Sequence, residues 1–338
     1  MPHFPTTTAQ WSPYDLDMAQ PRSQLVQTGT AGTFHCVQRC VRRAFLCGID
    51  TYTGQSFEHR KAWVATRIAL IASCFAADVL AYAVMSNHLH IVVHMDPSHV
   101  ATWSDESVVE RWMRLFPAGN GRADAHEHKR QRILEDLPYL SELRRRLGDL
   151  SWLMRCLAEP IARRANAEDG CKGRFWEGRY KCQLLCDTRA VLAAMTYVDL
   201  NPIRAGMATR LEDSDHTSIQ QRTEDARCDP TTLTQPLLPT SGSLLRCLPI
   251  HTSEYLDLVD WTGRQLREGK RGAIPIDVPH TLLSVDPSRE RWITRVKAIG
   301  SGYWRVVGDA QDLIAIAERI GQRWIKGLGV AKRIARAA

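Results

Sequence analysis

The sequence predicts an α+β fold with an antiparallel sheet, and three observations before residue 100 lead to this prediction. Residues 34 to 40 alternate as a β-strand does, although the alternation leaves open which face is buried. Residues 58 to 76 place apolar side chains at helical spacing on one face. Two apolar runs, 79 to 85 and 89 to 95, flank a short polar break and predict a hairpin of two antiparallel strands.

The composition is that of a globular protein with a small excess of positive charge. The 338 residues include 44 Lys and Arg against 37 Asp and Glu, and 44% are hydrophobic. This excludes collagen-like, low-complexity and wholly disordered chains. No apolar run reaches the roughly 18 residues of a membrane-spanning helix, so a soluble chain without a membrane partner is expected. The net charge of +7 is a weak hint of an anionic partner.

The N-terminal residues and the cysteines predict an irregular arm and a cytoplasmic protein. Residues 1 to 33 have no clear period, and their first part lacks the charged and apolar regions of a secretory signal. Without such a signal, the ten cysteines are expected to be reduced thiols. The pairs Cys36 and Cys40, and Cys182 and Cys186, leave a structural zinc site open beside the alternative of buried apolar thiols.

An insertion is expected at about residues 97 to 150. Residues 103 to 116 are amphipathic, whereas residues 118 to 136 are polar and charged, which is typical of an insertion or a flexible crossover. Helical periodicity returns between residues 150 and 161.

The second half of the chain predicts a helix, a linker and a helical C-terminal region. Asp187 or Thr188 is expected to cap a helix that Pro202 and Gly206 close. The segment 211–243 is rich in Ser, Thr, Asp, Gln and Pro and is interpreted as a surface linker. Amphipathic helical patterns follow in the region 244–338, at residues 254 to 267, 289 to 299, 309 to 325 and in a last piece that ends at 336.

The sharpest chemical signal is the pair His88 and His90 at the start of the second hairpin strand. Side chains two residues apart on a strand point the same way, and His94 shares their parity. Two neutral imidazoles on a rigid strand can hold one divalent cation and leave positions for a substrate oxygen. A chance His-x-His on a solvent-facing strand is the alternative.

A second signal is Tyr197 with Asn201, which lie four residues apart and therefore on one face of the predicted helix. A tyrosine hydroxyl is a poor nucleophile at its ordinary pKa near 10, so it needs a partner that stabilises phenolate or a metal-polarised electrophile. A half-buried aromatic at Tyr197 and a helix-terminal residue at Asn201 remain alternatives.

A third signal is the segment 172–181, in which basic side chains alternate with three aromatic ones. Basic groups can neutralise phosphates while bases stack on rings, as single-stranded nucleic acid requires. A charged loop whose aromatic side chains are buried in the core is equally consistent with this composition.

In this order along the chain, the three elements resemble the single-tyrosine HUH transposases, and among these the REP-associated tyrosine transposases. The resemblance runs from about Phe34 to Met207. It is carried by four short segments, Arg39 to Arg43, Ser86 to His90, Gly173 to Arg179 and Tyr197 to Gly206.

The resemblance implies a ferredoxin-like core with a central antiparallel sheet, in a catalytic domain at residues 34–210. His88 and His90 would be metal ligands for Mg²⁺ or Mn²⁺, Asn201 would be the third ligand, and Tyr197 would be the nucleophile. Two imidazoles and an amide suit Mn²⁺ at least as well as Mg²⁺, which prefers oxygen ligands.

The partner that this resemblance implies is single-stranded or hairpin DNA, cleaved by a monomer or a homodimer through a 5′-phosphotyrosine link. Four side chains are candidates for binding the strand: Arg174, Trp176, Arg179 and Lys181. The long insertion and the basic C-terminal region are not explained by the resemblance to these transposases. A non-cleaving hairpin-binding regulator and a metal-dependent phosphoesterase that uses the two histidines without a covalent tyrosine are the alternative functions.

Overall fold

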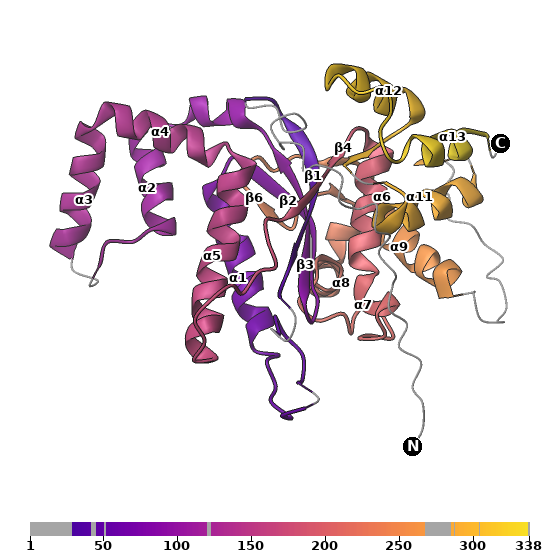
Figure 1. Ribbon diagram of the computed structural model, residues 1–338, viewed down its shortest axis with the longest axis horizontal. Coiled ribbons are helices and arrows are strands. Elements are labelled where there is room, and N and C mark those ends of the chain that lie inside the picture. Colours follow the sequence, from indigo (N-terminus) through magenta and orange to yellow (C-terminus); the bar gives the residue numbers. More distant parts are fainter. Residues whose placement is uncertain are drawn as a thin grey trace.

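The fold is α+β, with one six-stranded, mostly antiparallel sheet between two layers of helices (Figure 1). The computed structural model describes residues 29–41, 45–50, 52–119, 123–267, 285–286, 288–303 and 305–336. The strand order is β6-β2-β3-β1-β4-β8. The bounds are β1 Gly32–Arg39, β2 Ala77–Val84, β3 His88–Met95, β4 Lys181–Leu185, β6 Ser241–Gly242 and β8 Val306–Val307. Two further strands, β5 Pro236–Leu237 and β7 Leu248–His251, form a small separate sheet.

Each face of the central sheet has its own hydrophobic core. Helices α1 (Arg60–Cys74) and α5 (Leu150–Glu168) cover one face, with the apolar residues Leu89, Ile91 and Val93 of β3. Helix α6 (Thr188–Asp199) packs on the other face, where α9 (Thr252–Arg267) and α11 (Arg289–Ser301) lie against it. Since strand side chains alternate, His88 and His90 stand on the α6 face.

The predicted elements in the first hundred residues are confirmed. Strand β1 begins at Gly32, close to the predicted start at Phe34, and β2 and β3 form the predicted antiparallel hairpin. Helix α1 covers most of the predicted segment 58–76. The side chain of Asp187 accepts a 2.7 Å hydrogen bond from the Ala190 amide and so caps α6, as predicted.

The insertion is helical throughout most of its length, which corrects the prediction of a flexible stretch at 118–136. Its elements are the 3₁₀ helix η3 Pro97–Thr102 and the helices α2 Asp105–Leu115, α3 Ala123–Glu135 and α4 Leu137–Leu147. Helix α3 is mostly exposed, with Ile133 buried, so it has no apolar stripe to reveal it. Its Glu, Lys, Arg and Gln residues are strong helix formers. In Figure 1, α2, α3 and α4 project from the α1 side, away from α6.

The prediction of a linker at 211–243 is wrong, because this segment folds onto the sheet. It contains α8 (Ser218–Cys228) and the 3₁₀ helix η5 (Pro230–Thr234), and its end supplies β6, which pairs with β2. Its polar side chains are partly buried and hydrogen bonded: Arg222 donates to the Leu80 carbonyl at 2.6 Å. Some polar side chains of this segment are therefore buried and hydrogen bonded, and others are exposed to solvent.

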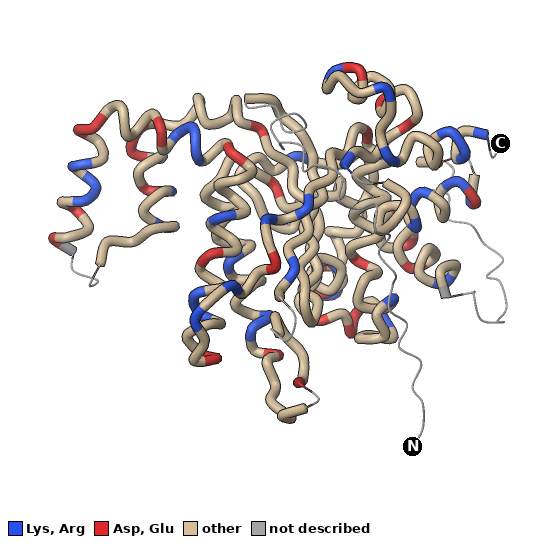
Figure 2. Tube along the Cα trace, in the orientation of Figure 1, with Lys and Arg blue, Asp and Glu red and all other residues tan. Residues whose placement is uncertain are grey.

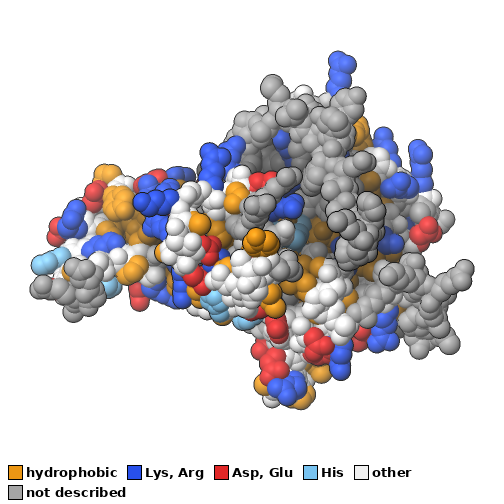
Figure 3. Space-filling model, turned by 60° about the horizontal axis from the view of Figure 1, so that its bottom comes forward, with side chains coloured by type: hydrophobic (Ala, Val, Ile, Leu, Met, Phe, Trp, Pro, Cys, Tyr) orange, Lys and Arg blue, Asp and Glu red, His pale blue; other side chains and the backbone are white. Residues whose placement is uncertain are grey.

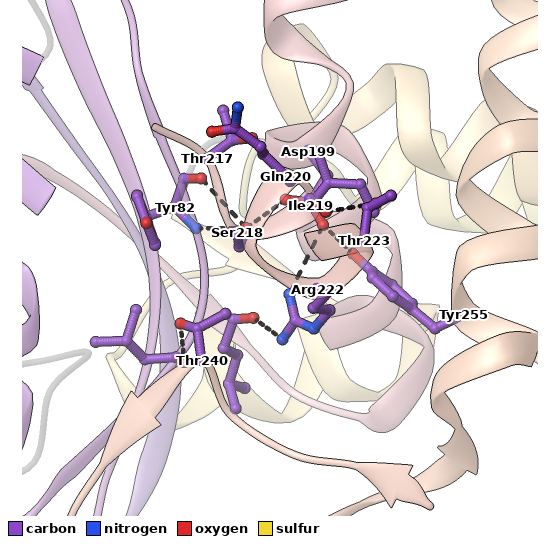
Figure 4. Close-up of polar contacts among 12 residues, drawn as sticks. Tyr82, Asp199, Thr217, Ser218, Ile219, Gln220, Arg222, Thr223, Thr240 and Tyr255 are labelled. Carbon is purple, nitrogen blue, oxygen red and sulfur yellow. Dashed lines mark hydrogen bonds and ion pairs between the residues drawn. The ribbon is translucent and has the colours of Figure 1, made fainter. Parts of the chain in front are cut away.

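A buried network at Asp199 joins the end of α6 to three other parts of the chain (Figure 4). The Asp199 carboxylate accepts hydrogen bonds from the hydroxyls of Ser218 and, at 2.6 Å, Tyr255, and it lies 4.0 Å from Arg222. The Ser218 hydroxyl also lies 3.2 Å from the Tyr82 carbonyl on β2. These contacts fix the helix that carries Tyr197 relative to the sheet.

The C-terminal region is not a separate unit, since it shares a hydrophobic core with the central sheet. One buried cluster extends from Leu80 to Ile334, and β8 lies parallel to β4 at the edge of the sheet. The four predicted helices are present; the last two are α12 Ala310–Arg319 and α13 Leu328–Arg336. Helix α12 ends earlier than the predicted 309–325, because Gly321 adopts a φ of +70°, which stops a helix.

Some predictions concern residues outside the described part of the chain. These are most of the N-terminal arm, residues 1 to 28, and the basic pair Arg42 and Arg43. Among the helices that the structure describes, none has the length and apolarity to cross a membrane.

Candidate active site

The two histidines and the tyrosine singled out from the sequence come together on the α6 face of the sheet. The ring centroids of His88 and His90 are 4.8 Å apart, and those of His90 and Tyr197 are 5.8 Å apart. Strand β3 supplies the imidazoles, and α6, which crosses above it, supplies the phenol. His90 of the hairpin and Tyr197 of the helix, more than a hundred residues apart in the chain, thus belong to one cluster.

A third imidazole, His35 of β1, completes this cluster. Its ring lies 6.0 Å from the ring of Tyr197, and its Nε2 lies 2.9 Å from Nδ1 of His90. On its other side, Nδ1 of His35 lies 2.6 Å from Oε1 of Gln183 in β4. The alternation of residues 34 to 40 indicates His35 only as one residue of a strand, and no sequence pattern points to Gln183.

Burial keeps all three imidazoles neutral at neutral pH. It lowers the pKa of His35 to about 4, against a smaller opposing effect of the hydrogen bond with Gln183. Burial, and then the charge of Arg39, lowers the pKa of His88 to about 4. Burial also holds the pKa of His90 well below its ordinary value, with smaller effects of His35, His88 and Arg204. Neutral imidazole is the form that binds a metal ion.

The hydrogen bonds of His88 and Asn201 indicate which donor atoms these two side chains leave available. Nδ1 of His88 lies 2.7 Å from Oδ1 of Asn87, an acceptor, so Nδ1 carries the hydrogen and Nε2 keeps a lone pair. Asn201 is buried, and its Nδ2 has no hydrogen-bond partner. A half-turn of this amide presents the carbonyl oxygen in place of the nitrogen. Among the described residues, no three His, Cys, Asp or Glu side chains are placed to hold a metal ion, so two imidazoles need an amide or a bound oxygen ligand.

Tyr197 and Asn201 lie on two successive helices, although the sequence predicts one helix for both. Helix α6 ends at Asp199, and the short helix α7 (Asn201–Arg204) follows with Pro202 in its first turn. Gly206, with a φ of +72°, ends this second helix. Pro202 and Gly206, which the sequence predicts to close one helix, thus lie at the start and at the end of α7.

The surroundings of Tyr197 include a cation and a glycine. The guanidinium of Arg204, which is exposed, lies 4.7 Å from the centre of the phenol ring. The backbone of α11 approaches so closely that a Cβ atom on Gly300 would lie 2.6 Å from the Tyr197 hydroxyl oxygen. Tyr197 is 9% exposed as a result of this packing.

The four candidate DNA-binding side chains do not form one surface. Lys181 is exposed and, like Gln183 two residues on, has the strand parity of the α6 face, where the histidines lie. Arg174, Trp176 and Arg179 instead line a cavity of about 550 Å³ with residues of α5, on the opposite face. Trp176 donates its indole N–H to the Ala158 carbonyl at 2.8 Å, which fixes the ring against α5.

Basic side chains are spread over the molecule. On the face shown in Figure 3, Lys and Arg lie at separate places, with Asp and Glu between some of them. Figure 2 shows basic residues on α12 and α13 close to the C-terminus. The basic C-terminal end and the basic segment at 172–181 therefore belong to different parts of the surface.

Comparison with known proteins identifies no family for this chain. No family model matches it, and no curated protein matches it. A solved structure of a REP-associated tyrosine transposase bound to a REP hairpin is similar over 63% of this chain and 85% of that chain, with 13% identity and a TM-score of 0.35. A similarity of this size does not assign a family or a function to the chain.

Proposed function

We propose that this chain is a metal-dependent DNA strand transferase that cleaves and rejoins single-stranded DNA near hairpins, with Tyr197 as nucleophile. The observation that carries the proposal is the cluster of His88, His90 and Tyr197. The two imidazoles lie beside the ring of Tyr197, and they bring together two of the four sequence segments on which the resemblance to the HUH transposases rests.

The reaction is a transesterification at phosphorus. The Tyr197 oxygen attacks one phosphodiester and forms a P–O bond, the bond to the 3′ oxygen breaks, and the phenol proton passes to solvent as that oxygen takes up a proton. The products are a 5′-phosphotyrosine link and a free 3′-hydroxyl. A second 3′-hydroxyl reverses the step, so DNA is rejoined without ATP.

The chain's own side chains would hold the metal and the scissile phosphate. His88, His90 and Asn201 would bind Mg²⁺ or Mn²⁺, which when bound polarises the phosphate oxygens. The cation of Arg204 lies beside the phenol ring, where it can pair with the phosphate that the hydroxyl attacks. Lys181, on the same face, is suited to the backbone of the strand.

We also assign the ferredoxin-like type of core to this chain. The order β2-β3-β1-β4 and the position of α1 and α5 on one face support this assignment. The opposite face remains free for α6, which carries the nucleophile in the proposed reaction.

The burial of Tyr197 favours a second candidate function, a DNA-hairpin-binding regulator that does not cleave. The phenol is 9% exposed and Gly300 lies against its hydroxyl, so a phosphodiester needs a shift of α11 or of the ring to reach it. A protein that binds hairpins without cleaving them does not require a phosphodiester to reach the hydroxyl of Tyr197.

A single experiment separates these functions. The full chain is incubated with Mn²⁺ and a labelled single-stranded DNA that ends in a hairpin, and denaturing gels are searched for a covalent adduct. The adduct is expected with the natural sequence and lost with Tyr197→Phe. Tyr180→Phe is the matched control, because Tyr180 is equally buried but lies near Ser151 of α5, on the opposite face.

Each result of the adduct experiment supports one interpretation. An adduct that survives Tyr197→Phe removes the nucleophile assignment. Cleavage without any adduct indicates a metal-dependent phosphoesterase that uses the two histidines alone. Tight hairpin binding with neither cleavage nor adduct indicates the regulator.

A further inference from the structure

We propose that Gln183 and His35 are positioning residues that hold the Nε2 lone pair of His90 toward the bound cation. The proposal rests on the proposed function, since it assigns a role to two side chains that the resemblance does not mention. It also gives the C-terminal region a role in the site, because the hydrogen-bond chain begins at its backbone.

The orientation of the Gln183 amide is set by two backbone carbonyls. Its Nε2 lies 3.1 Å from the carbonyl oxygen of Ile299, in α11, and 3.4 Å from that of Tyr303. A carbonyl oxygen only accepts, so the NH₂ group must face these two residues. The amide oxygen is thereby directed at His35, which is the cross-strand neighbour of Gln183 between β1 and β4.

The amide oxygen in turn sets the tautomer of His35. It lies 2.6 Å from Nδ1 of His35 and can only accept a hydrogen bond, so Nδ1 carries the hydrogen. The ring is 2% exposed, and its two hydrogen-bond partners are an amide and an imidazole, neither of which carries a negative charge. Since a buried cation without a counter-charge is costly, the ring is neutral and its Nε2 is an acceptor.

The tautomer of His35 in turn determines the tautomer of His90. Nε2 of His35 lies 2.9 Å from Nδ1 of His90, the ring centroids are 5.2 Å apart, and the ring planes differ by 11°. Such a long centroid distance across so short a contact places the two rings almost end to end, so the lone pair and the N–H lie nearly in one plane. With the opposite tautomer of His90, two lone pairs would face each other in a buried site. His90 therefore carries its hydrogen on Nδ1 and keeps Nε2 free.

The two histidines among the proposed ligands are thus oriented by different means. His88 has a local partner, the adjacent Asn87 side chain. His90 depends on a chain of three hydrogen bonds that crosses β1 and β4 and ends on carbonyls more than two hundred residues away. Partners of this kind raise ligand basicity and fix ring orientation, and their loss typically costs about 10–100-fold in metal affinity.

The first test reads the tautomers directly. Long-range ¹H–¹⁵N spectra of the DNA-free full chain, labelled with ¹⁵N-histidine and kept in EDTA, distinguish the protonated from the unprotonated nitrogen of each ring, and His90→Gln identifies the signals of His90. His35 and His90 are both expected in the Nδ1–H form. An Nε2–H tautomer at His90 would overturn the proposal, and this measurement needs no variant of the two positioning residues to fold.

The second test is Mn²⁺ affinity, measured by isothermal titration calorimetry without DNA. His35→Leu and Gln183→Leu are expected to weaken binding about 10–100-fold. His35→Gln, which keeps an acceptor near the position of Nε2, is expected to restore most of the affinity. Gln221→Leu is the matched control, because Gln221 also donates to a backbone carbonyl, that of Thr240 at 3.2 Å, but lies away from the histidines.

The results distinguish the positioning role from stability and from the proposed function. Urea unfolding in EDTA reports any loss of stability, which His35→Gln and His35→Leu would share if the role were only structural. Equal Mn²⁺ affinities in those two variants would contradict the proposal. If the natural sequence binds no Mn²⁺, the proposed metal site fails, and the tautomers alone decide whether the hydrogen-bond chain exists.

Discussion

The hydroxyl of Tyr255 in α9 donates a 2.6 Å hydrogen bond to the carboxylate of Asp199, at the end of the helix that carries Tyr197. Both side chains are fully buried, so water cannot replace this bond. Tyr255→Phe is expected to lower the free energy of unfolding by about 1.5–3 kcal/mol, the usual range for a hydrogen bond to a charged group. Urea unfolding measures the change. Tyr52→Phe, at a ring that is 95% exposed, should stay within about 0.5 kcal/mol, and equal losses in both variants would contradict the argument.

Gly300 leaves room for the hydroxyl of Tyr197. A Cβ atom at this position would lie 2.6 Å from the hydroxyl oxygen and 3.0 Å from two ring carbons, so Gly300→Ala must displace the ring or α11. We expect a loss of about 1–3 kcal/mol in the free energy of unfolding, as in other overpacked cores. We also expect a lower yield of the DNA adduct, because displacement by about 1 Å can reduce a rate about 10²-fold.

Gly329 in α13 is the control for this substitution. Nothing lies within 4 Å of a Cβ atom there, so Gly329→Ala should leave stability unchanged or raise it by up to about 1 kcal/mol. If Gly300→Ala gave the same stability and adduct yield as Gly329→Ala, the close approach of α11 to the tyrosine would not matter.

The parts of the site that sequence reasoning found are those with local spacing. His88 and His90 lie two apart on one strand, so they share a face whatever the rest of the fold does. The helical pattern also places Tyr197 on a helix, whereas Asn201, four residues on, begins the next helix. The hairpin and its helix α1 were predictable for the same reason, because apolar residues repeat with a fixed period along one segment.

The contacts that sequence reasoning missed have no local period. His35 and Gln183 are 148 residues apart, and only the pairing of β1 with β4 makes them neighbours. Arg222 and Ser218 lie in a segment whose polar composition is typical of a linker, yet they are buried around Asp199. Buried polar side chains of this kind cannot be told from exposed ones until their partners are known.

His94, at the far end of β3, predicts a specific loss of stability in acid. Burial, and then the cation of Arg246, lowers its pKa from the ordinary value of 6.5, against smaller opposing effects of Asp78 and Asp96. A histidine with a lowered pKa in the folded state takes up its proton first in the unfolded state. Its contribution is therefore complete above about pH 6.5 and is lost as the pH falls below that value.

The comparison of two proteins isolates this contribution. Between neutral pH and about pH 5, the free energy of unfolding in EDTA should fall more steeply for the natural sequence than for His94→Gln, by less than about 1.4 kcal/mol per pH unit, the limit for one proton. The other buried histidines are common to both proteins and cancel in the difference. Parallel pH profiles would show that His94 titrates alike in the folded and unfolded states.

Arg204 tests whether the cation beside Tyr197 serves chemistry or packing. Its guanidinium lies 4.7 Å from the phenol ring but is exposed, and such cation–π contacts are worth only about 0.5–1 kcal/mol. Arg204→Ala should therefore change stability by less than about 1 kcal/mol. It should lower the rate of adduct formation by about 10-fold or more, since a charge-assisted contact with the phosphate is worth at least about 1.5 kcal/mol.

Arg210→Ala is the matched control for that variant. Arg210 is also exposed, and its partner is Glu212, at 3.2 Å. Because it makes no contact with the phenol ring, its loss should leave the adduct rate within about twofold, a difference of less than about 0.5 kcal/mol. Equal rates for the two variants would mean that the general positive charge of this surface attracts DNA. A slow rate for Arg204→Ala alone, with unchanged unfolding, would assign this residue to the phosphate that Tyr197 attacks.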